Sequence, residues 1–399
     1  MDDLPALPEE TQLMNEIKHA MKESSAAGAK KIQEYLEKLN NTPLNIGVTG
    51  ESGAGKSTFI NAFRGIKTSD ERAAPVGCTK TTMEVKQYAH PTHPSIILWD
   101  MPGIGTMKFP ASKYLKQVGF ERFDFFIIIS AGRFRENDVK IALEIQKMEK
   151  KFYFVRSKID HSLCDAEEDE SDFTEERTLR TIKEDCLQNL QKLGFQSPQV
   201  FLISSRKLHL YDFPHLHDTL ERTLSAHKRH VLLLGMPIIN SDIIEKKKEA
   251  FQYQIKYMAT LSGAVALVPV PGLSAGVDLG LITSYVRKYQ VGFGLDKTSL
   301  KNLSQTTHVP LRELEQVMTS PLAGKNISAS VLKDILINSA THVVLITIEE
   351  GLRFLPVFSF VSGVVSFVST YQSLRFFLNM LAEDAKNVFK KALGLNTSV

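Results

Sequence analysis

The stretch LNIGVTGESGAGKSTFINAFR, residues 44–64, decides the fold of this chain. Its first part, LNIGVT, is an apolar run that predicts a buried strand. Its last part, KSTFINAFR, places apolar side chains at the spacing of one helix face, and Gly65 marks the expected end of that helix. Between them GESGAGKS, residues 50–57, matches G-x-x-x-x-G-K-[ST] at every fixed position. A strand, a glycine-rich turn and a helix in this order predict a phosphate-binding loop.

The residue types of this loop suit a nucleoside triphosphate. Its glycines let the backbone approach phosphate oxygens, and the start of the helix adds a partial positive charge. Lys56 can reach the β- and γ-phosphates, and the Ser57 hydroxyl can ligate Mg²⁺, so we expect both to serve in catalysis. The expected nucleotide contacts are Gly50, Glu51, Ser52, Gly53, Ala54, Gly55, Lys56, Ser57 and Thr58.

Strand-like and helical stretches alternate from residue 44 to about residue 205. Near-continuous apolar runs, typical of strands covered on both faces, occur at 96–99, 123–130, 152–155 and 200–203. Helical stretches lie between them, for example at 138–151 and 174–193. This alternation predicts an α/β fold with a doubly wound, mostly parallel sheet. We expect the acidic run at 165–172 to be a solvated loop.

An acidic residue and a glycine follow the strand-like run at 96–99. Asp100 can hold Mg²⁺ through water, and the Gly103 amide can sense a γ-phosphate and so take part in catalysis. The next residue is Ile104, where small GTPases use a Gln to orient the attacking water. We therefore expect slow hydrolysis by the monomer, with a catalytic element supplied by a second subunit docked across the nucleotide.

A segment rich in threonine connects the phosphate-binding loop to the strand before Asp100. It reads AAPVGCTKTTM, residues 73–83, and Thr79, Thr81 or Thr82 could donate an oxygen to Mg²⁺ in a switch that orders around GTP. Of the three, we predict that Thr82 is the metal ligand and a catalytic residue.

The sequence SKID, residues 157–160, predicts which base is bound. It follows a strand and is a Ser variant of the guanine-reading pattern [NT]-K-x-D. The Asp160 carboxylate can accept two hydrogen bonds from guanine that adenine cannot supply, and the stem of Lys158 can lie along the base. The loop expected to close over the guanine comprises Ser204, Ser205 and Arg206. These residues predict a P-loop GTPase domain of the Ras-like kind that binds GTP or GDP with Mg²⁺.

The remaining segments are helical in pattern. Residues 11–40 carry helical periodicity with a break near 24–29, and helical patterns dominate beyond 226. Residues 354–371 hold no charge and approach the length of a minimal membrane span, but recurring Ser and Gly favour a buried helix. We expect three parts: an N-terminal helical segment at 1–43 that packs with the C-terminal helices, the GTPase domain at 44–225, and a C-terminal helical domain at 226–399.

Composition narrows the cellular setting. The chain carries 48 basic and 45 acidic residues without a basic patch of interleaved aromatics, so we expect no nucleic acid partner. Three scattered cysteines fit a reducing compartment. The start MDDL has no apolar run and no Gly at the second position, so neither secretion nor N-myristoylation is expected. The expected location is the cytoplasm.

Several of these motifs together resemble the immunity-related GTPases, the IRG family. GESGAGKSTFINAFRGI, WDMPGIGT, DFFIIISAGRFRENDV and KKFYFVRSKID carry the resemblance in the nucleotide domain. It continues through YDFP at 211–214, AHKRH at 226–230, FGLD at 293–296, TSP at 319–321 and AEDAK at 382–386. With Lys56 in its loop, the chain resembles the family members that carry GKS, and not the regulatory members that carry Met in place of this lysine.

The resemblance implies an interferon-inducible, dynamin-like GTPase of cell-autonomous innate immunity. Such proteins self-assemble through their nucleotide faces, as homodimers, larger oligomers or with other family members, and act on intracellular membranes around pathogen vacuoles. Their helical domain is built from both chain ends. Because the family's usual myristoylation start is absent, membrane association must be peripheral and use another device, for which helices within 330–378 are the candidates. Lys80 stands where relatives often carry an acidic residue, so no catalytic role is transferred to it.

Two other functions remain open. A GTP-gated adaptor with negligible turnover agrees with the absence of a Gln after Gly103. A ribosome- or RNA-associated GTPase would need a basic appendage, which the near-neutral helical tail does not supply.

Overall fold

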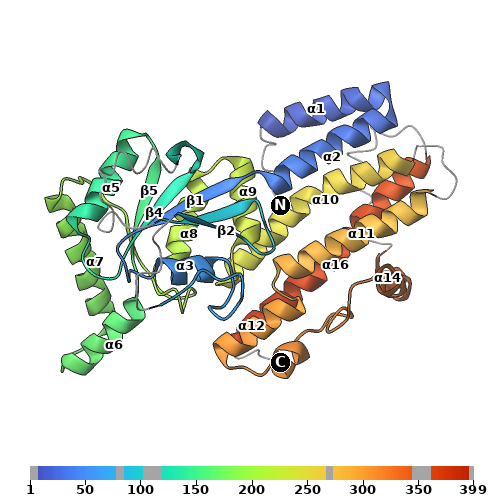
Figure 1. Cartoon of the computed structure of the whole chain (residues 1–399). Helices are drawn as coiled ribbons and strands as arrows, with labels where there is room; N and C mark the ends of the chain where they lie inside the picture. Colours follow the sequence, from blue (N-terminus) through green and yellow to red (C-terminus); the bar gives the residue numbers. More distant parts are fainter. Residues whose placement is uncertain (1–7, 78–84, 102–118, 267–272, 344–360, 395–399) are drawn as a thin grey trace. The chain divides into compact units, whose positions relative to one another are not determined.

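The computed structural model describes residues 8–77, 85–101, 119–266, 273–343 and 361–394 (Figure 1). It divides into two compact units. One unit is continuous, Asn41–Ile239, and the other joins the two ends of the chain, Met1–Asn40 and Asn240–Val399.

The continuous unit contains a six-stranded sheet in the order β2-β3-β1-β4-β5-β6. All neighbouring strands pair in parallel except β2 and β3, which are antiparallel. The predicted mostly parallel α/β sheet is confirmed. Its strands are β1 Leu44–Thr49, β2 Lys86–Ala89, β3 Ile96–Asp100, β4 Phe125–Ser130, β5 Lys151–Arg156 and β6 Val200–Leu202.

Helices cover both faces of this sheet, which explains why β4 is apolar at nearly every position. Phe126 and Ile128 of β4 belong to a buried cluster that includes side chains of α5, α6 and α7. On the opposite face, the rings of Phe201 in β6 and His215 in α8 lie 5.4 Å apart. The helices of this unit are α3 Lys56–Phe63, α5 Glu136–Lys147, α6 Ile159–Asp169, α7 Glu175–Lys192, α8 Phe213–Thr223 and α9 Ala226–Gly235, with a short 3₁₀ turn η2 at Phe120–Arg122.

Three local features differ from the sequence prediction. The acidic run expected as a loop is helical as far as Asp169, because buried Ile159 and Leu163 anchor α6 and leave its carboxylates in solvent. The edge strand β2 has the polar sequence KQYA and gave no apolar signal. The helix expected at 138–151 ends at Lys147, since the chain already enters β5 at Lys151.

The boundary between the units also lies later than expected. Residues 226–239 belong to the unit that contains the sheet, and not to the C-terminal helical part. The reason is burial: α9 carries five consecutive buried residues and contacts β1 and β3. At Gly235 a Cβ atom would lie 2.2 Å from Cδ1 of Ile96 in β3, so this helix end is in direct contact with the sheet.

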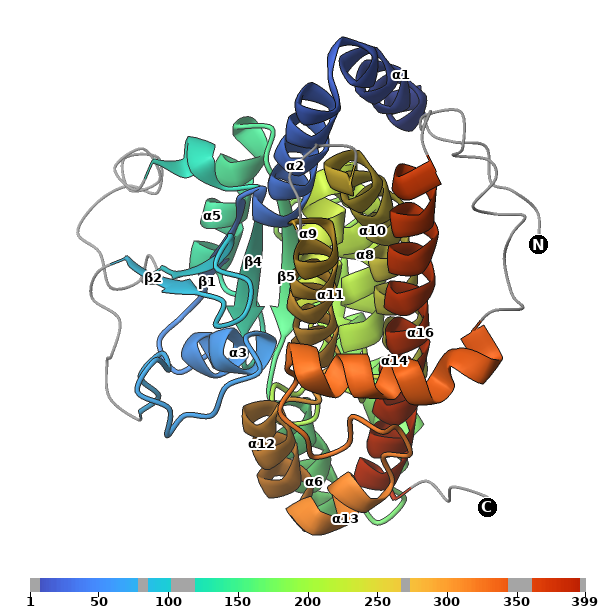
Figure 2. The ribbon, with the colours of Figure 1, turned by 90° about the vertical axis from the view of Figure 1, so that its right-hand side faces the viewer.

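The second unit is helical wherever the structure describes regular elements. Helices α10, α11 and α16 lie side by side (Figures 1 and 2), and the hydroxyls of Ser262 in α10 and Thr370 in α16 lie 2.9 Å apart. The N-terminal segment joins this unit through α2, where the Tyr35 hydroxyl lies 3.0 Å from that of Tyr253 in α10. The helices are α1 Pro8–Glu23, α2 Ser25–Asn41, α10 Ser241–Ala266, α11 Leu273–Gly292, α12 Lys297–Thr307, α13 Leu311–Gln316, α14 Ala329–Val343 and α16 Val361–Ala392.

No helix in the described ranges combines the length and the apolar content that a membrane span requires. Of the uncharged stretch 354–371, residues 354–360 lie outside the described part of the chain. Within α16, Phe367 is buried against Ala259, with Met21 and Tyr371 packed around the pair. Phe367 therefore belongs to the core of the helical unit.

Candidate nucleotide-binding site

The phosphate-binding loop connects β1, in the middle of the sheet, to α3. Gly50 has φ of 142°, and a Cβ atom there would lie 2.0 Å from the carbonyl oxygen of Ile129 in β4, so only glycine fits. Gly55, with φ of 95°, is the N-cap of α3 and supplies no side-chain cap. Because no side chain among the described residues caps this end of α3, the backbone N–H groups of its first turn can donate to a bound anion.

The Lys56 side chain folds back over the loop. It is 7% exposed, and its Nζ donates to the carbonyl oxygens of Gly50 and Glu51, each at 2.9 Å. Burial lowers the pKa of Lys56, while the nearby carboxylates of Asp100, Asp138 and Glu51 raise it. Uncharged carbonyls compensate the buried positive charge of this ammonium only in part. A phosphate would stabilise it more, because it supplies both a negative charge and hydrogen-bond acceptors.

Ser57 and Asp100 are brought together from two elements. The Ser57 hydroxyl, in the first turn of α3, donates to Oδ2 of Asp100 at the end of β3 over 3.0 Å. Asp100 is 2% exposed. A hydroxyl and a carboxylate are the hard oxygen ligands that Mg²⁺ prefers, so this pair fits the ion that the sequence predicts. The metal would screen the charge of the phosphates, and these two side chains would hold it.

The guanine-reading loop is hydrogen-bonded to the phosphate-binding loop. Ser157 is buried, and its hydroxyl donates to the carbonyl oxygen of Ala54 at 2.6 Å. Lys158 takes a left-handed conformation, with φ of 57°, as the N-cap of α6. This turn places Asp160 in the first helical turn, with its side chain 16% exposed. The Ser157 hydroxyl thus joins the two loops that are expected to contact opposite ends of a nucleotide.

The loop after β6 lies against the same reader. The backbone N–H of Ile159 donates to the carbonyl oxygen of Ile203 over 3.3 Å. Ser204 is buried, and its Oγ accepts the backbone N–H of Arg206, whose side chain is exposed. The hydrogen bond at Ile203 therefore places the loop that begins with Ser204 next to the SKID turn.

Some expected site residues lie outside the described part of the chain. These are the candidate switch threonines, Thr82 among them, together with Gly103 and Ile104. Their roles stay predictions from the sequence.

The structure adds two residues to the site that sequence reasoning missed. Asp138 is 2% exposed and accepts the backbone N–H of Arg135 at 3.0 Å, which caps the start of α5. Burial raises the pKa of Asp138 to about 6, and the charge of Glu51 adds to this effect. The Arg135 guanidinium lies 3.2 Å from Oε2 of Glu51 in the phosphate-binding loop. An acidic residue three positions after the N-cap is a capping signal that could have identified Asp138.

Comparison with known proteins agrees with this site. The family described as "Interferon-inducible GTPase (IIGP)" matches residues 10–392. "Interferon-inducible GTPase 5" of Rattus norvegicus is 40% identical, over 98% of this chain and 86% of the relative. "Interferon-gamma-inducible GTPase 10" of Mus musculus is 37% identical, over 92% of this chain and 86% of the relative. The match spans both structural units and includes the loop, the Ser57–Asp100 pair and the guanine reader, and this chain belongs to the interferon-inducible GTPase family.

Proposed function

We propose that this chain binds GTP with Mg²⁺ and hydrolyses it to GDP and phosphate. One observation carries the proposal: the loop with Lys56, the Ser57–Asp100 pair and the SKID turn come together at the ends of β1, β3 and β5. Residues in this arrangement can bind the phosphates, the metal ion and the guanine base of one nucleotide at the same time. Membership of a GTPase family and the names of the relatives support it.

We further propose that turnover is slow in the monomer and rises when two copies meet across their nucleotide faces. The support is the sequence, which has Ile104 where small GTPases carry a water-orienting Gln. A partner would then supply the missing catalytic element, as an arginine finger does in trans for other GTPases.

The biological setting follows from the family resemblance. We propose a cytoplasmic, interferon-inducible, dynamin-like protein that self-assembles when GTP is bound. It would associate peripherally with intracellular or pathogen-vacuole membranes in cell-autonomous immunity. Homo-oligomers and other family members are the proposed partners, and nucleic acid is not among them.

GTP turnover per molecule, measured across a range of protein concentrations, tests the catalytic part of this proposal. A rise in turnover with concentration is the expected result, with Lys56→Ala as the background. Equal turnover at low and high concentration would contradict activation by a second copy. Tight GTP binding with negligible turnover at every concentration would instead favour a GTP-gated adaptor.

A further inference from the structure

The side chain of Asp212 closes the base of the loop that follows β6. Because β6 is an edge strand of the sheet, its outward backbone groups need partners from elsewhere. The N–H of Leu202 donates to Oδ2 of Asp212 over 3.0 Å, and the N–H of Asp212 donates back to the carbonyl oxygen of Leu202 over 2.8 Å. This exchange fastens residues 203–211 into one loop. Near the start of that loop lie the residues expected to close over the guanine, Ser204, Ser205 and Arg206.

Asp212 is the N-cap of α8, but its carboxylate is turned to the strand instead. An aspartate at an N-cap usually accepts an N–H from the first turn of its helix. Among the described residues, no such bond joins the Asp212 side chain to α8. Its Oδ2 accepts the Leu202 N–H and also, at 2.8 Å, Nζ of Lys183 in α7, which balances the negative charge. This departure from the local preference indicates that the role of the carboxylate lies outside α8.

The residue before Asp212 brings the far end of the loop to the guanine reader. Tyr211 has φ of 59°, a left-handed conformation that is unfavourable for an aromatic residue. Its side chain packs against the buried cluster to which α6 contributes Ile159. Burial raises the pKa of Tyr211, and the charges of Glu175 and Asp160 add to this effect. The Tyr211 hydroxyl is thus within electrostatic reach of the carboxylate that is expected to read the base.

Both ends of the loop are therefore held beside the SKID turn. The hydrogen bond to Ile203 holds its start, while Asp212 and Tyr211 hold its end. Within the loop, the backbone N–H of Lys207 donates to the carbonyl oxygen of Ser204 at 3.2 Å, which is a local turn. A local turn shapes a loop but does not fix its position on the molecule. The position of this loop therefore depends on how its two ends are held.

We propose that Asp212 is a positioning residue that sets how strongly the site prefers guanine to other bases. Its carboxylate holds the end of the loop against β6 and so keeps Ser204, Ser205 and Arg206 next to the SKID turn. The phosphates are expected to bind another loop, residues 50–57, so contacts to them do not depend on this carboxylate. The inference rests on the proposed binding of guanine nucleotides.

The test compares the affinities of GDP and ADP, each competing with labelled GDP, in the unaltered protein, Asp212→Ala and Asp212→Asn. The two nucleotides share ribose and phosphates and differ in the base. Asp212→Ala removes the acceptor of the Leu202 N–H and should lower the preference for GDP over ADP by about tenfold. Asp212→Asn keeps a side-chain oxygen for this N–H but loses the charge, so the preference should fall by only about threefold. Affinity for ADP should stay within about twofold in both variants.

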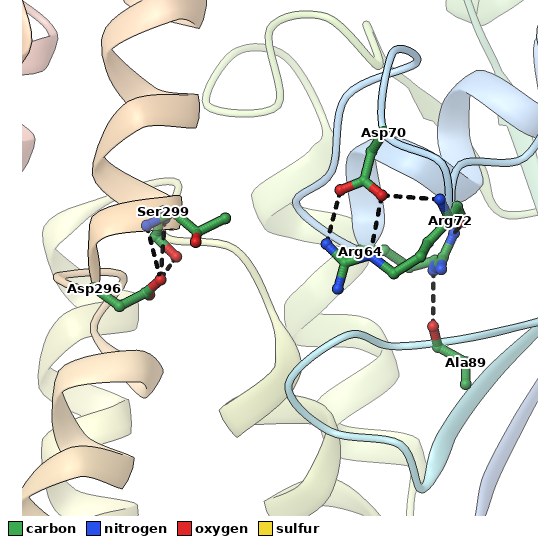
Figure 3. A network of polar contacts seen from close by, with 7 residues as sticks. Arg64, Asp70, Arg72, Ala89, Asp296 and Ser299 are labelled. Atoms are coloured by element: carbon green, nitrogen blue, oxygen red, sulfur yellow. Dashed lines mark hydrogen bonds and ion pairs between the residues drawn. The ribbon is translucent and has the colours of Figure 1, made fainter.

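Asp70→Ala is the matched control (Figure 3). The Asp70 carboxylate also accepts a backbone N–H, that of Arg72 at 2.9 Å, and a basic side chain, Nη2 of Arg72 at 2.7 Å. The carbonyl oxygen of Arg72 is bonded by Arg64 at the C-cap of α3, the end of this helix opposite to the phosphate-binding loop. The control therefore removes the same kinds of contact far from the reader, and the preference for GDP over ADP should not change.

Thermal unfolding of each variant separates stability from base selection. A lower unfolding temperature in Asp212→Ala with an unchanged ratio of GDP to ADP affinity would mean that the carboxylate only stabilises the fold, and would overturn the inference alone. If Asp212→Ala does not fold, Asp212→Asn carries the test, and an unchanged ratio in that variant has the same consequence. If the unaltered protein bound ADP as tightly as GDP, the proposed function would fail as well.

Discussion

Asp160 is the residue on which the proposed selection of guanine depends. It lies in the first turn of α6, close to the surface, at the end of the turn that Ser157 joins to the phosphate-binding loop. Asp160→Asn turns one acceptor into a donor, which matches xanthine better than guanine. We expect affinity for GTP to fall by about a hundredfold and affinity for xanthosine triphosphate to rise. A hundredfold loss is the size expected when two hydrogen bonds to a charged carboxylate are disrupted.

Asp169→Asn, at the exposed end of the same helix, is the control and should leave base preference unchanged. A competition assay with both nucleotides measures the outcome. An Asp160→Asn protein that still selected GTP over the xanthine nucleotide would show that another residue reads the base.

Asp138 makes stability depend on pH. Burial raises its pKa from 3.8 to about 6, so the folded protein retains a proton that the unfolded chain releases. Between about pH 4 and pH 6 the free energy of unfolding therefore falls as pH rises, by at most about 3 kcal/mol. Asp138→Asn cannot ionise and can still accept the Arg135 N–H.

The free energy of unfolding, from urea titrations without nucleotide, should thus favour Asp138→Asn increasingly between pH 4 and pH 7. The expected gain relative to the unaltered protein is about 1–3 kcal/mol. Comparing the two proteins cancels the titration of the other carboxylates. A difference that stays constant over this range would refute the assignment.

Among the structural elements, the turn between β1 and α3 tolerates change very unevenly. A Cβ atom at Gly50 would overlap the Ile129 carbonyl at 2.0 Å, whereas one at Gly53 would meet nothing within 4 Å. Gly50→Ala should therefore cost about 3 kcal/mol or more, because backbone must move. Gly53→Ala should cost only about 1–2 kcal/mol, for its positive φ.

Unfolding free energies of these two variants without nucleotide measure the contrast. Equal losses at Gly50 and Gly53 would mean that the close approach of β4 to the loop does not restrict the turn.

The elements that the sequence predicted well are those with a local signal. The strand at 44–49 and the helix from Lys56 follow from an apolar run, a motif and a terminating Gly65, all within about twenty residues. The edge strand β2 was missed because its polar side chains mostly face solvent and only its pairing with β3 defines it. In α6 two buried residues outweighed the acidic run, an effect of packing that charge pattern does not show.

The same distinction applies to the site. Motif spacing predicted Lys56, Ser57, Asp100 and Asp160, since each lies at or just beyond the carboxyl end of a strand in a mostly parallel sheet. The bond from Ser157 to Ala54 joins residues 103 apart in sequence, and the side chain of Asp138 gains its environment only from folding. Such contacts depend on strand order, which motif spacing leaves open.

The whole chain gives the nucleotide site its proposed purpose. The family match covers the helical unit as well as the sheet, so the site belongs to a larger architecture than a minimal GTPase domain. In the proposed function, bound GTP controls whether copies of the chain assemble, and Lys56 is the cation that this control requires.

The measurement that tests this claim most directly is light scattering of the purified protein with GTPγS, with GDP and without nucleotide. We expect the scattering mass to rise with GTPγS alone, and Lys56→Ala to show no rise under any of the three conditions. The same mass in all three conditions, with the site saturated by labelled nucleotide, would contradict GTP-dependent assembly.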